Sequence, residues 1–288
     1  MSSIYPDPYK VWSEFVPTYL KFHRSGNATE ATVQLVEAAN AVLPFSKAST
    51  ILDVGCGGGQ IVNYIMEKYS TVLPENARIV ALDFVEGMVN LVREQQRDHI
   101  NRGDAVWGQL ETAELDATDL SSIKDGECSH VLAGFVYSDI PDSAKALKEA
   151  HRILQEGGIV ALTNMRDAEW LDLLQVVKEI RQDLPETPTA KSFAPTWFED
   201  AGTKAHLENA GFRDVEIRRI PIHYGAKSYQ ELRGKLFETV PFMPKWLKQM
   251  SEEEIERAKD LLVERVSKVH TSEPIALLGT ATLAIGRK

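Results

Sequence analysis

Residues 50–60 constrain the fold more than any other segment, since they read Thr-Ile-Leu-Asp-Val-Gly-Cys-Gly-Gly-Gly-Gln. An apolar, β-branched stretch ends at Asp53 and a glycine-rich turn follows, after which residues 61–66 carry apolar side chains at helical spacing. The pattern predicts a buried strand, a tight loop and a helix. Glycines lack the Cβ atoms that would keep a nucleoside away from the backbone, and the start of a helix offers N–H groups to a negative ligand group. We therefore expect an α/β fold with a nucleoside-binding turn after its first strand.

The spacing of the glycines distinguishes two kinds of adenosine-containing ligand. A dinucleotide fingerprint, G-x-G-x-x-G, counted from Gly55 would put its last glycine at position 60, where Gln60 stands. The run is instead Asp-x-Gly-x-Gly-x-Gly, beginning at Asp53 and continuing through Gly57. This run resembles the first motif of the class I S-adenosylmethionine-dependent methyltransferases.

Two further acids follow predicted strands. Residues 78–83 form a second apolar run that ends at Asp83, 28 residues beyond Gly55. A carboxylate there can accept hydrogen bonds from both ribose hydroxyls, although an aspartate at a strand end can equally cap the next helix. Residues 115–120 predict a third strand end, which carries Asp116. In open α/β sheets such strand ends share the edge where ligands bind.

The resemblance covers residues 49–166, including a fourth strand at 131–135 and a helix-to-strand corner that ends at Gly157 and Gly158. Within the family the chain looks most like the small-molecule methyltransferases of ubiquinone biosynthesis and fungal secondary metabolism. The resemblance implies S-adenosylmethionine as the cofactor and S-adenosylhomocysteine as the product. It implies the following cofactor-binding residues: Asp53, Gly55, Cys56, Gly57, Asp83, Phe84, Met88, Asp116, Ala117, Phe135 and Tyr19.

Helices are expected before the first strand, because aromatic residues recur at helical spacing over residues 8–23 and a second apolar pattern follows Asn27. In many methyltransferases such helices fold over the cofactor. Tyr5, Tyr9 and Tyr19 are therefore candidates to reach the cofactor carboxylate with a phenol while their rings close the site.

The alternation of strand and helix patterns predicts a Rossmann-like, seven-stranded, mostly parallel sheet with an antiparallel last strand, N-terminal helices and a helical cap insertion. The expected division is an N-terminal helical lid, a cofactor-binding core and two cap insertions over the substrate pocket. Their boundaries are 1–48 for the lid, 49–166 with 203–223 and 273–288 for the core, and 167–202 with 224–272 for the cap. The cap segments are rich in aromatic residues, which favours an apolar pocket for a flat acceptor.

Composition limits the partners. The 288-residue chain has a formal charge of −10 and no block of lysines or arginines, so it would repel a nucleic-acid backbone. Its two cysteines predict neither a disulfide framework nor a metal site. No signal peptide or membrane-spanning stretch is recognised. We expect a small-molecule substrate and a cytoplasmic location, with no nucleic-acid, metal or membrane partner; the oligomeric state is left open.

The resemblance implies methylation of an oxygen, nitrogen or carbon atom of a small, apolar or aromatic metabolite. Methyl transfer is a direct displacement that needs alignment and exclusion of water more than covalent catalysis. His223, at the end of the sixth predicted strand, is the first candidate for a general base, since a histidine can titrate near neutrality. His151 is read as structural, while Tyr137 and Asp139 could orient an acceptor. A mechanism without a protein base is an open alternative. So are a cofactor-retaining enzyme that catalyses a non-methylating rearrangement and a methyltransferase-like regulatory binding protein.

Overall fold

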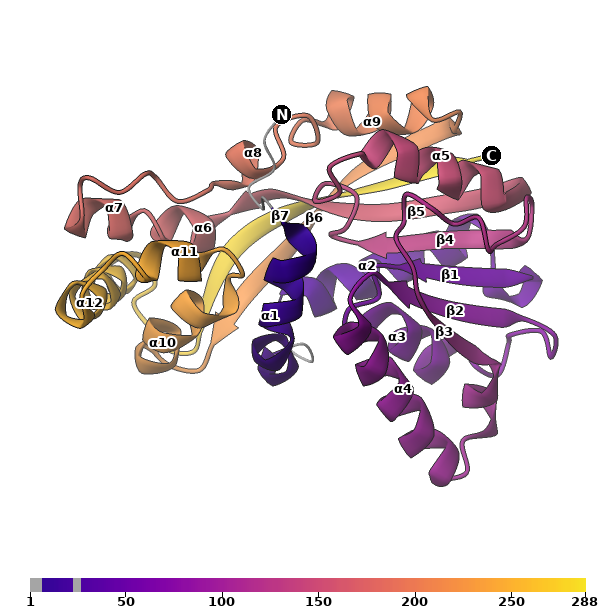
Figure 1. Ribbon diagram of the computed structural model, residues 1–288, viewed down its shortest axis with the longest axis horizontal. Helices are drawn as coiled ribbons and strands as arrows, with labels where there is room; N and C mark the ends of the chain where they lie inside the picture. Colours follow the sequence, from indigo (N-terminus) through magenta and orange to yellow (C-terminus); the bar gives the residue numbers. More distant parts are fainter. Residues whose placement is uncertain (1–6, 23–26) are drawn as a thin grey trace.

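The computed structural model describes residues 7–22 and 27–288, and within these ranges seven strands form one sheet in the order β3-β2-β1-β4-β5-β7-β6 (Figure 1). The neighbours from β3 through to β5 pair in parallel, whereas β7 is antiparallel to both β5 and β6. The predicted Rossmann-like fold with an antiparallel last strand is therefore confirmed. The strands are β1 (Thr50–Val54), β2 (Arg78–Asp83), β3 (Leu110–Glu114), β4 (Cys128–Gly134), β5 (Leu154–Ala168), β6 (Arg213–Ala226) and β7 (Ile275–Arg287).

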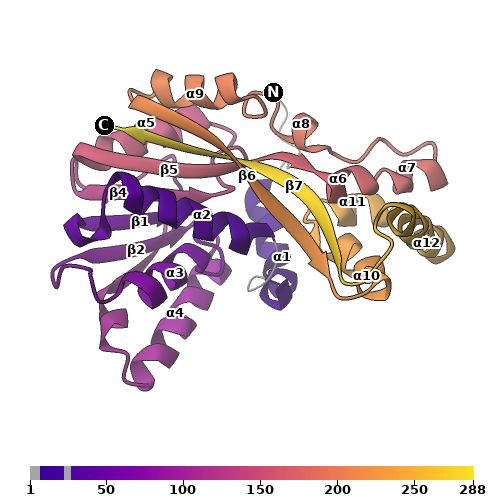
Figure 2. The same ribbon diagram turned by 180° about the vertical axis from the view of Figure 1, so that it is seen from behind.

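Two helical layers cover the faces of the sheet. Successive side chains of a strand point to opposite faces, so that Ile51 packs in one apolar layer and Leu52 in the other. Ile79 and Val80 repeat this alternation in β2. The first layer is covered by α2 (Asn27–Val42), α3 (Gln60–Tyr69) and α4 (Glu86–Asn101), and the second by α5 (Ser143–Ile153) and α9 (Asp200–Asn209) (Figure 2). Burial on both faces explains the continuous apolar runs in the central strands.

The last three strands of the sheet extend beyond the others. The β6–β7 pairing continues to Ala226 opposite Ile275, and the β5–β7 pairing continues to Ala168 opposite Gly279. Figures 1 and 2 show β6 and β7 running past the ends of β1 to β4 to reach a group of helices at one end of the molecule. These cap helices are α6 (Glu169–Leu173), α7 (Val176–Ile180), α8 (Ala190–Phe193), α10 (Tyr229–Thr239), α11 (Met243–Leu247) and α12 (Glu252–Val269).

The remaining elements connect the cap to the core. Helix α1 (Pro8–Phe22) contacts both α10 of the cap and α4 of the core. Two short 3-10 helices, η1 (Phe45–Lys47) and η2 (Ala105–Gln109), precede β1 and β3. Among the described helices, none combines the length and the apolar character that crossing a membrane requires.

One local prediction was wrong. The third strand is β3 at Leu110–Glu114, a half-exposed strand at the edge of the sheet, so Asp116 lies in the following loop rather than at a strand end. The residues after Trp170 form two short helices, α6 and α7. Pro244 falls in the first turn of α11, where its missing N–H has no intrahelical partner to lose.

Candidate functional site

The loop between β1 and α3 needs its glycines for conformation and for space. Gly55 has φ 65° and Gly57 has φ 51°, in the left-handed region that favours glycine. A Cβ atom on Gly55 would lie 2.6 Å from a methyl carbon of Val136. One on Gly57 would lie 2.7 Å from the hydroxyl of Tyr19. The loop backbone is therefore closely approached by side chains from two other segments.

Asp83 holds this loop against the end of β2. The carboxylate is 6% exposed, and its two oxygens accept the N–H groups of Gly57 and Val85, each at 3.0 Å. Burial raises the pKa of Asp83, and these backbone N–H groups oppose that rise. The neighbouring Cys56 is also buried, and burial together with the charges of Asp53 and Asp83 raises the pKa of its thiol well above the ordinary value. Cys56 is therefore a neutral packing residue beside the two acids.

Asp53 is a buried acid that faces a cavity. It is 1% exposed, and neither carboxylate oxygen has a hydrogen-bond partner in the part of the chain that the structure describes. Burial, and then the nearby charge of Asp83, raise the pKa of Asp53 to about 8. The cavity has a volume of about 50 Å³. It is lined by Tyr19, Ala28, Ala31, Thr32, Asp53, Gly55, Cys56, Gln60, Ile61, Gly134, Phe135 and Thr163. A cationic ligand group that entered this cavity would offset the cost of ionising Asp53.

Helix α1 contacts the glycine loop through Tyr19. The hydroxyl of Tyr19 accepts a hydrogen bond of 2.6 Å from the side-chain amide of Gln60, and burial raises the pKa of Tyr19 to about 12. Phe84, directly after β2, and Met88, in the first turn of α4, pack in one apolar cluster with α1. Tyr9 is half exposed and meets Phe84 edge-on at 5.9 Å between ring centroids. Tyr5, the remaining tyrosine candidate, lies outside the described residues.

A second cavity, of about 260 Å³, adjoins the first. The two share four wall residues, Tyr19, Ala28, Gln60 and Phe135. Large rings and apolar side chains form most of the remaining wall, contributed by α1, by the end of β5 and by the cap: Trp12, Phe15, Met165, Trp170, Leu171, Phe193 and Phe242. The smaller cavity thus opens toward an apolar chamber between core and cap.

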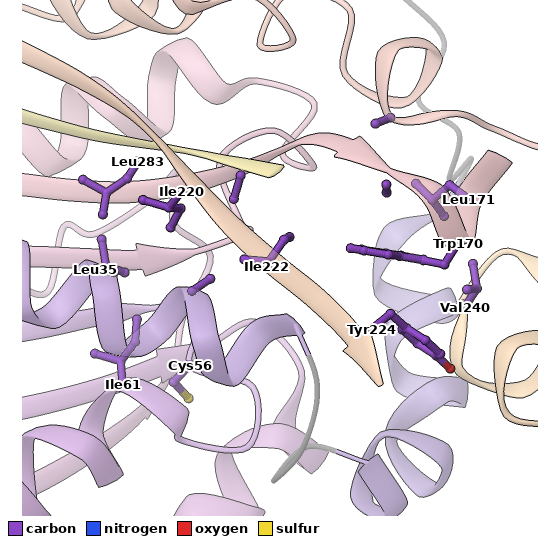
Figure 3. Packing of buried hydrophobic residues seen from close by; sticks show 14 of the residues in the cluster. Leu35, Cys56, Ile61, Trp170, Leu171, Ile220, Ile222, Tyr224, Val240 and Leu283 are labelled. Carbon is purple, nitrogen blue, oxygen red and sulfur yellow. The ribbon is translucent and has the colours of Figure 1, made fainter. Parts of the chain in front are cut away.

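Figure 3 shows Trp170 and Tyr224 facing each other beyond Ile222, with Val240 beside them. The two rings are stacked, with centroids 5.8 Å apart and planes inclined by 29°. The hydroxyl of Tyr224 lies 2.7 Å from the Thr239 hydroxyl, which fixes the ring on the cap. Four of the aromatic residues predicted for the cap, Trp170, Phe193, Tyr224 and Phe242, line the chamber.

One acid reaches the larger cavity. Asp139 lies in the turn after β4, and burial raises its pKa to about 7, opposed by a hydrogen bond of 3.3 Å from the Ser138 hydroxyl. The same turn begins with Phe135, whose φ of 59° is unusual for a residue with a side chain. Strained backbone of this kind tends to occur where a side chain must be aimed at a ligand.

His223 occupies a different place. Its Nδ1 is 3.0 Å from the carboxylate of Glu30, which also accepts the His223 backbone N–H at 2.8 Å. His223 is not among the residues that line either cavity. Its role as a base stays a prediction.

The other candidates divide between the site and its surroundings. Tyr137 is buried in the opposite apolar layer, with α5 and α9, and His151 packs edge-on against Phe212. Asp116 is exposed and its carboxylate accepts the Thr118 N–H, while Ala117 beside it is buried. These two residues line neither cavity. The Leu115 N–H donates a hydrogen bond to the Asp83 carbonyl, which holds their loop next to the end of β2.

Several wall residues were missed from the sequence. Ala28, Ala31 and Thr32 form one face of α2, and their spacing of three and four residues was the available signal. Gln60 and Lys235 were also missed, since a single polar residue at the start or in the middle of a helix has no distinctive pattern.

Comparisons with known proteins agree with this geometry. The methyltransferase domain family matches residues 52–162. Methyltransferase ucsB of an Acremonium species is 31% identical over 96% of this chain and 94% of its own length. The demethylmenaquinone methyltransferase of Staphylococcus carnosus is 32% identical over 65% of this chain and 80% of its own. A crystal structure from Bacillus halodurans, described as a methyltransferase, covers 89% of this chain and 98% of its own, with a TM-score of 0.53 at 17% identity, which shows the fold.

Proposed function

Since this chain belongs to the class I S-adenosylmethionine-dependent methyltransferases, we propose that it methylates a small, planar and largely apolar acceptor held in the larger cavity. One observation carries the proposal: a cavity lined by an unpaired acid at the glycine loop shares its walls with an aromatic chamber. The amino-acid portion of the cofactor would enter the first space, and the acceptor would occupy the second. The methyl group would then lie near the shared residues, of which Phe135 and Tyr19 are the largest.

The residues present fit S-adenosylmethionine. Asp53, buried without a partner, would receive the positively charged amino-acid portion of the ligand. Each Asp83 carboxylate oxygen accepts one backbone hydrogen bond and has a further lone pair. These lone pairs would accept hydrogen bonds from the ribose hydroxyls. Phe84 and Met88 would contact the adenine ring, as would Asp116 and Ala117 from the neighbouring loop. Gly55, Cys56 and Gly57 would let the ligand approach the backbone.

When bound, S-adenosylmethionine supplies a methyl group on a positively charged sulfur. The chain's task is to hold the acceptor in line with that group and to keep water away. Orientation of this kind can contribute on the order of 7–11 kcal/mol to lowering a barrier. The rings of Trp12, Phe15 and Phe135 exclude water, and their faces can stabilise a nearby cation.

The acceptor class rests on the chamber and on one relative. The relative named demethylmenaquinone methyltransferase is by its name an enzyme for a quinone-related molecule, which is planar and apolar. The chamber, walled by stacked Trp170 and Tyr224, suits a molecule of that shape. In this proposal residues 1–48 form a lid, 167–202 and 224–272 cover the acceptor, and the remainder is the cofactor-binding core.

The proposed setting is cytoplasmic, which the absence of a disulfide framework in the cysteine pattern favours. We propose no nucleic-acid partner, because a formal charge of −10 would repel a phosphate backbone.

The test is calorimetric binding of S-adenosylmethionine together with an assay for S-adenosylhomocysteine release. We expect the wild type to bind the cofactor, and Asp83→Ala to bind it about 1.5–3 kcal/mol more weakly because charge-assisted bonds to the ribose are lost. Unchanged affinity would remove the role assigned to Asp83. An acceptor converted without any S-adenosylhomocysteine release would favour the non-methylating alternative.

A further inference from the structure

The larger cavity combines apolar walls with one acid. Its titratable wall residues, among those that the structure describes, are Tyr19, Asp139, Tyr224 and Lys235. Burial raises the pKa of both tyrosines, so each stays neutral over the physiological range. Lys235 is 3.7 Å from the Glu231 carboxylate, and its ammonium donates to the Gly225 carbonyl at 2.8 Å. Among these groups Asp139 is the one that can accept a proton near neutral pH.

The backbone places Asp139 in the same turn as Phe135. The Asp139 N–H donates to the Val136 carbonyl at 2.9 Å, closing a tight turn directly after Phe135. Phe135 is a wall of both cavities, whereas Ser138 and Asp139 line the larger one. One carboxylate oxygen accepts the Ser138 hydroxyl, which fixes the orientation of the group. A short rigid turn therefore carries a wall of the cofactor space and an acid in the acceptor space.

We propose that Asp139 is the proton acceptor in catalysis and that the methylated group is a weakly acidic hydroxyl, a phenol or enol, on the planar acceptor. This inference rests on the proposed function. In the step, the hydroxyl oxygen forms a bond to the methyl carbon as the carbon–sulfur bond breaks and its electron pair stays on sulfur. The hydroxyl proton passes to the Asp139 carboxylate and later to water. The products are a methyl ether, S-adenosylhomocysteine and one proton.

The chemistry of the chamber favours a hydroxyl over a carboxylic acid as the acceptor group. A carboxylic acid enters already ionised, needs no base and is repelled by an ionised Asp139. A phenol has a pKa of about 10 and must lose its proton as it reacts. Burial brings the pKa of Asp139 to about 7, which is closer to that of a phenol than an exposed aspartate would be, and a general base works best when its pKa lies near the operating pH.

Binding of 2-naphthol in the presence of saturating S-adenosylhomocysteine tests the inference without requiring turnover. The ether 2-methoxynaphthalene has the same ring system and no proton to donate. We expect the wild type at about pH 8 to bind 2-naphthol at least about tenfold more tightly than the ether, because an ionised carboxylate accepts the hydroxyl bond. The preference should fall as the pH drops below about 7 and Asp139 becomes protonated.

Variants assign the effect to one residue. Asp139→Asn should lose both the preference and its pH dependence, and its rate of methyl transfer to 2-naphthol should fall about a hundredfold or more. Asp139→Glu, which keeps a carboxylate, should retain the pH dependence at a reduced rate. The matched control is Asp98→Asn, which removes one carboxylate from the exposed surface of α4. It should behave as the wild type.

The possible outcomes distinguish a failure of the proposed function from a failure of the role proposed for Asp139. If the wild type binds neither S-adenosylmethionine nor S-adenosylhomocysteine, the proposed function fails. If S-adenosylhomocysteine binds normally to all variants but Asp139→Asn keeps the preference for 2-naphthol with the same pH dependence, Asp139 is not the proton acceptor. Equal affinity of the wild type for 2-naphthol and its ether would likewise overturn the inference.

Discussion

Asp53→Asn should make the ligand-free protein more stable at alkaline pH while weakening its hold on the cofactor. The Asp53 carboxyl is 1% exposed, and burial with the charge of Asp83 raises its pKa to about 8. In the unfolded chain an aspartate titrates near 3.9, so between these two values the folded protein retains a proton that the unfolded chain has released. The stability that this carboxyl contributes is therefore complete below the unfolded value and is lost as the pH rises through about 8.

The expected magnitude follows from that difference in pKa. One pKa unit corresponds to about 1.4 kcal/mol, and the folded carboxyl stays protonated over most of the interval from about pH 5 to about pH 8. Over that interval the wild type should lose about 4 kcal/mol of unfolding free energy relative to Asp53→Asn. Asparagine has nearly the same shape and does not titrate, so the contributions of other groups cancel. Its own unpaired amide adds a pH-independent cost of about 1–3 kcal/mol.

Denaturant unfolding of both proteins at about pH 5 and about pH 8, without cofactor, measures this change. Calorimetry at neutral pH should show S-adenosylmethionine binding to the variant about tenfold more weakly or worse, because the wild-type carboxyl can release its proton when the ligand cation binds and the amide cannot ionise. A stability difference between the two proteins that stays constant with pH would refute the reasoning. It would mean that Asp53 ionises in the folded protein without a desolvation cost.

Two further substitutions test the loop and the predicted base. Gly57→Ala should lower the unfolding free energy by about 1–2 kcal/mol, because residue 57 has a left-handed backbone and a Cβ would lie 2.7 Å from the Tyr19 hydroxyl. Thermal unfolding and cofactor titration measure the effect. A variant with unchanged stability and cofactor affinity would contradict this prediction. The sequence-based prediction for His223→Ala is lower turnover with near-normal cofactor affinity, whereas its place beside Glu30 and outside the cavity walls leads us to expect unchanged turnover. Initial rates measured across the pH range distinguish these two expectations. A loss of turnover with near-normal cofactor affinity would support His223 as the general base.

The cofactor side of the site could be predicted because its parts are local in sequence. Asp53 lies near the end of β1 and the glycines follow that strand directly. Asp83 ends the next strand along the chain, which pairs in parallel with β1. Apolar runs bounded by acids and glycines therefore identified both strand ends. The loop after β3 was placed less well, because an edge strand with half-exposed residues has a weak apolar signal.

The acceptor side depends on contacts between distant segments. Burial raises the pKa of Asp139, which lies in the wall of a cavity that the N-terminal helix and both cap segments also line. The residues around position 139 form no pattern that predicts these distant contacts. His223 was expected in the pocket from its position near a strand end. Its partner Glu30 lies 193 positions earlier in the chain, a distance over which sequence patterns carry no information.

The long β6–β7 pair makes the chamber wall depend on strand register. Tyr224 of that wall pairs with Leu277, on the same ladder that joins Ile217 to Ala284. A slip of one residue in this pairing would turn the Tyr224 side chain to the opposite face of the sheet. The shape of the chamber is therefore set in part by hydrogen bonds of the sheet that lie far from it.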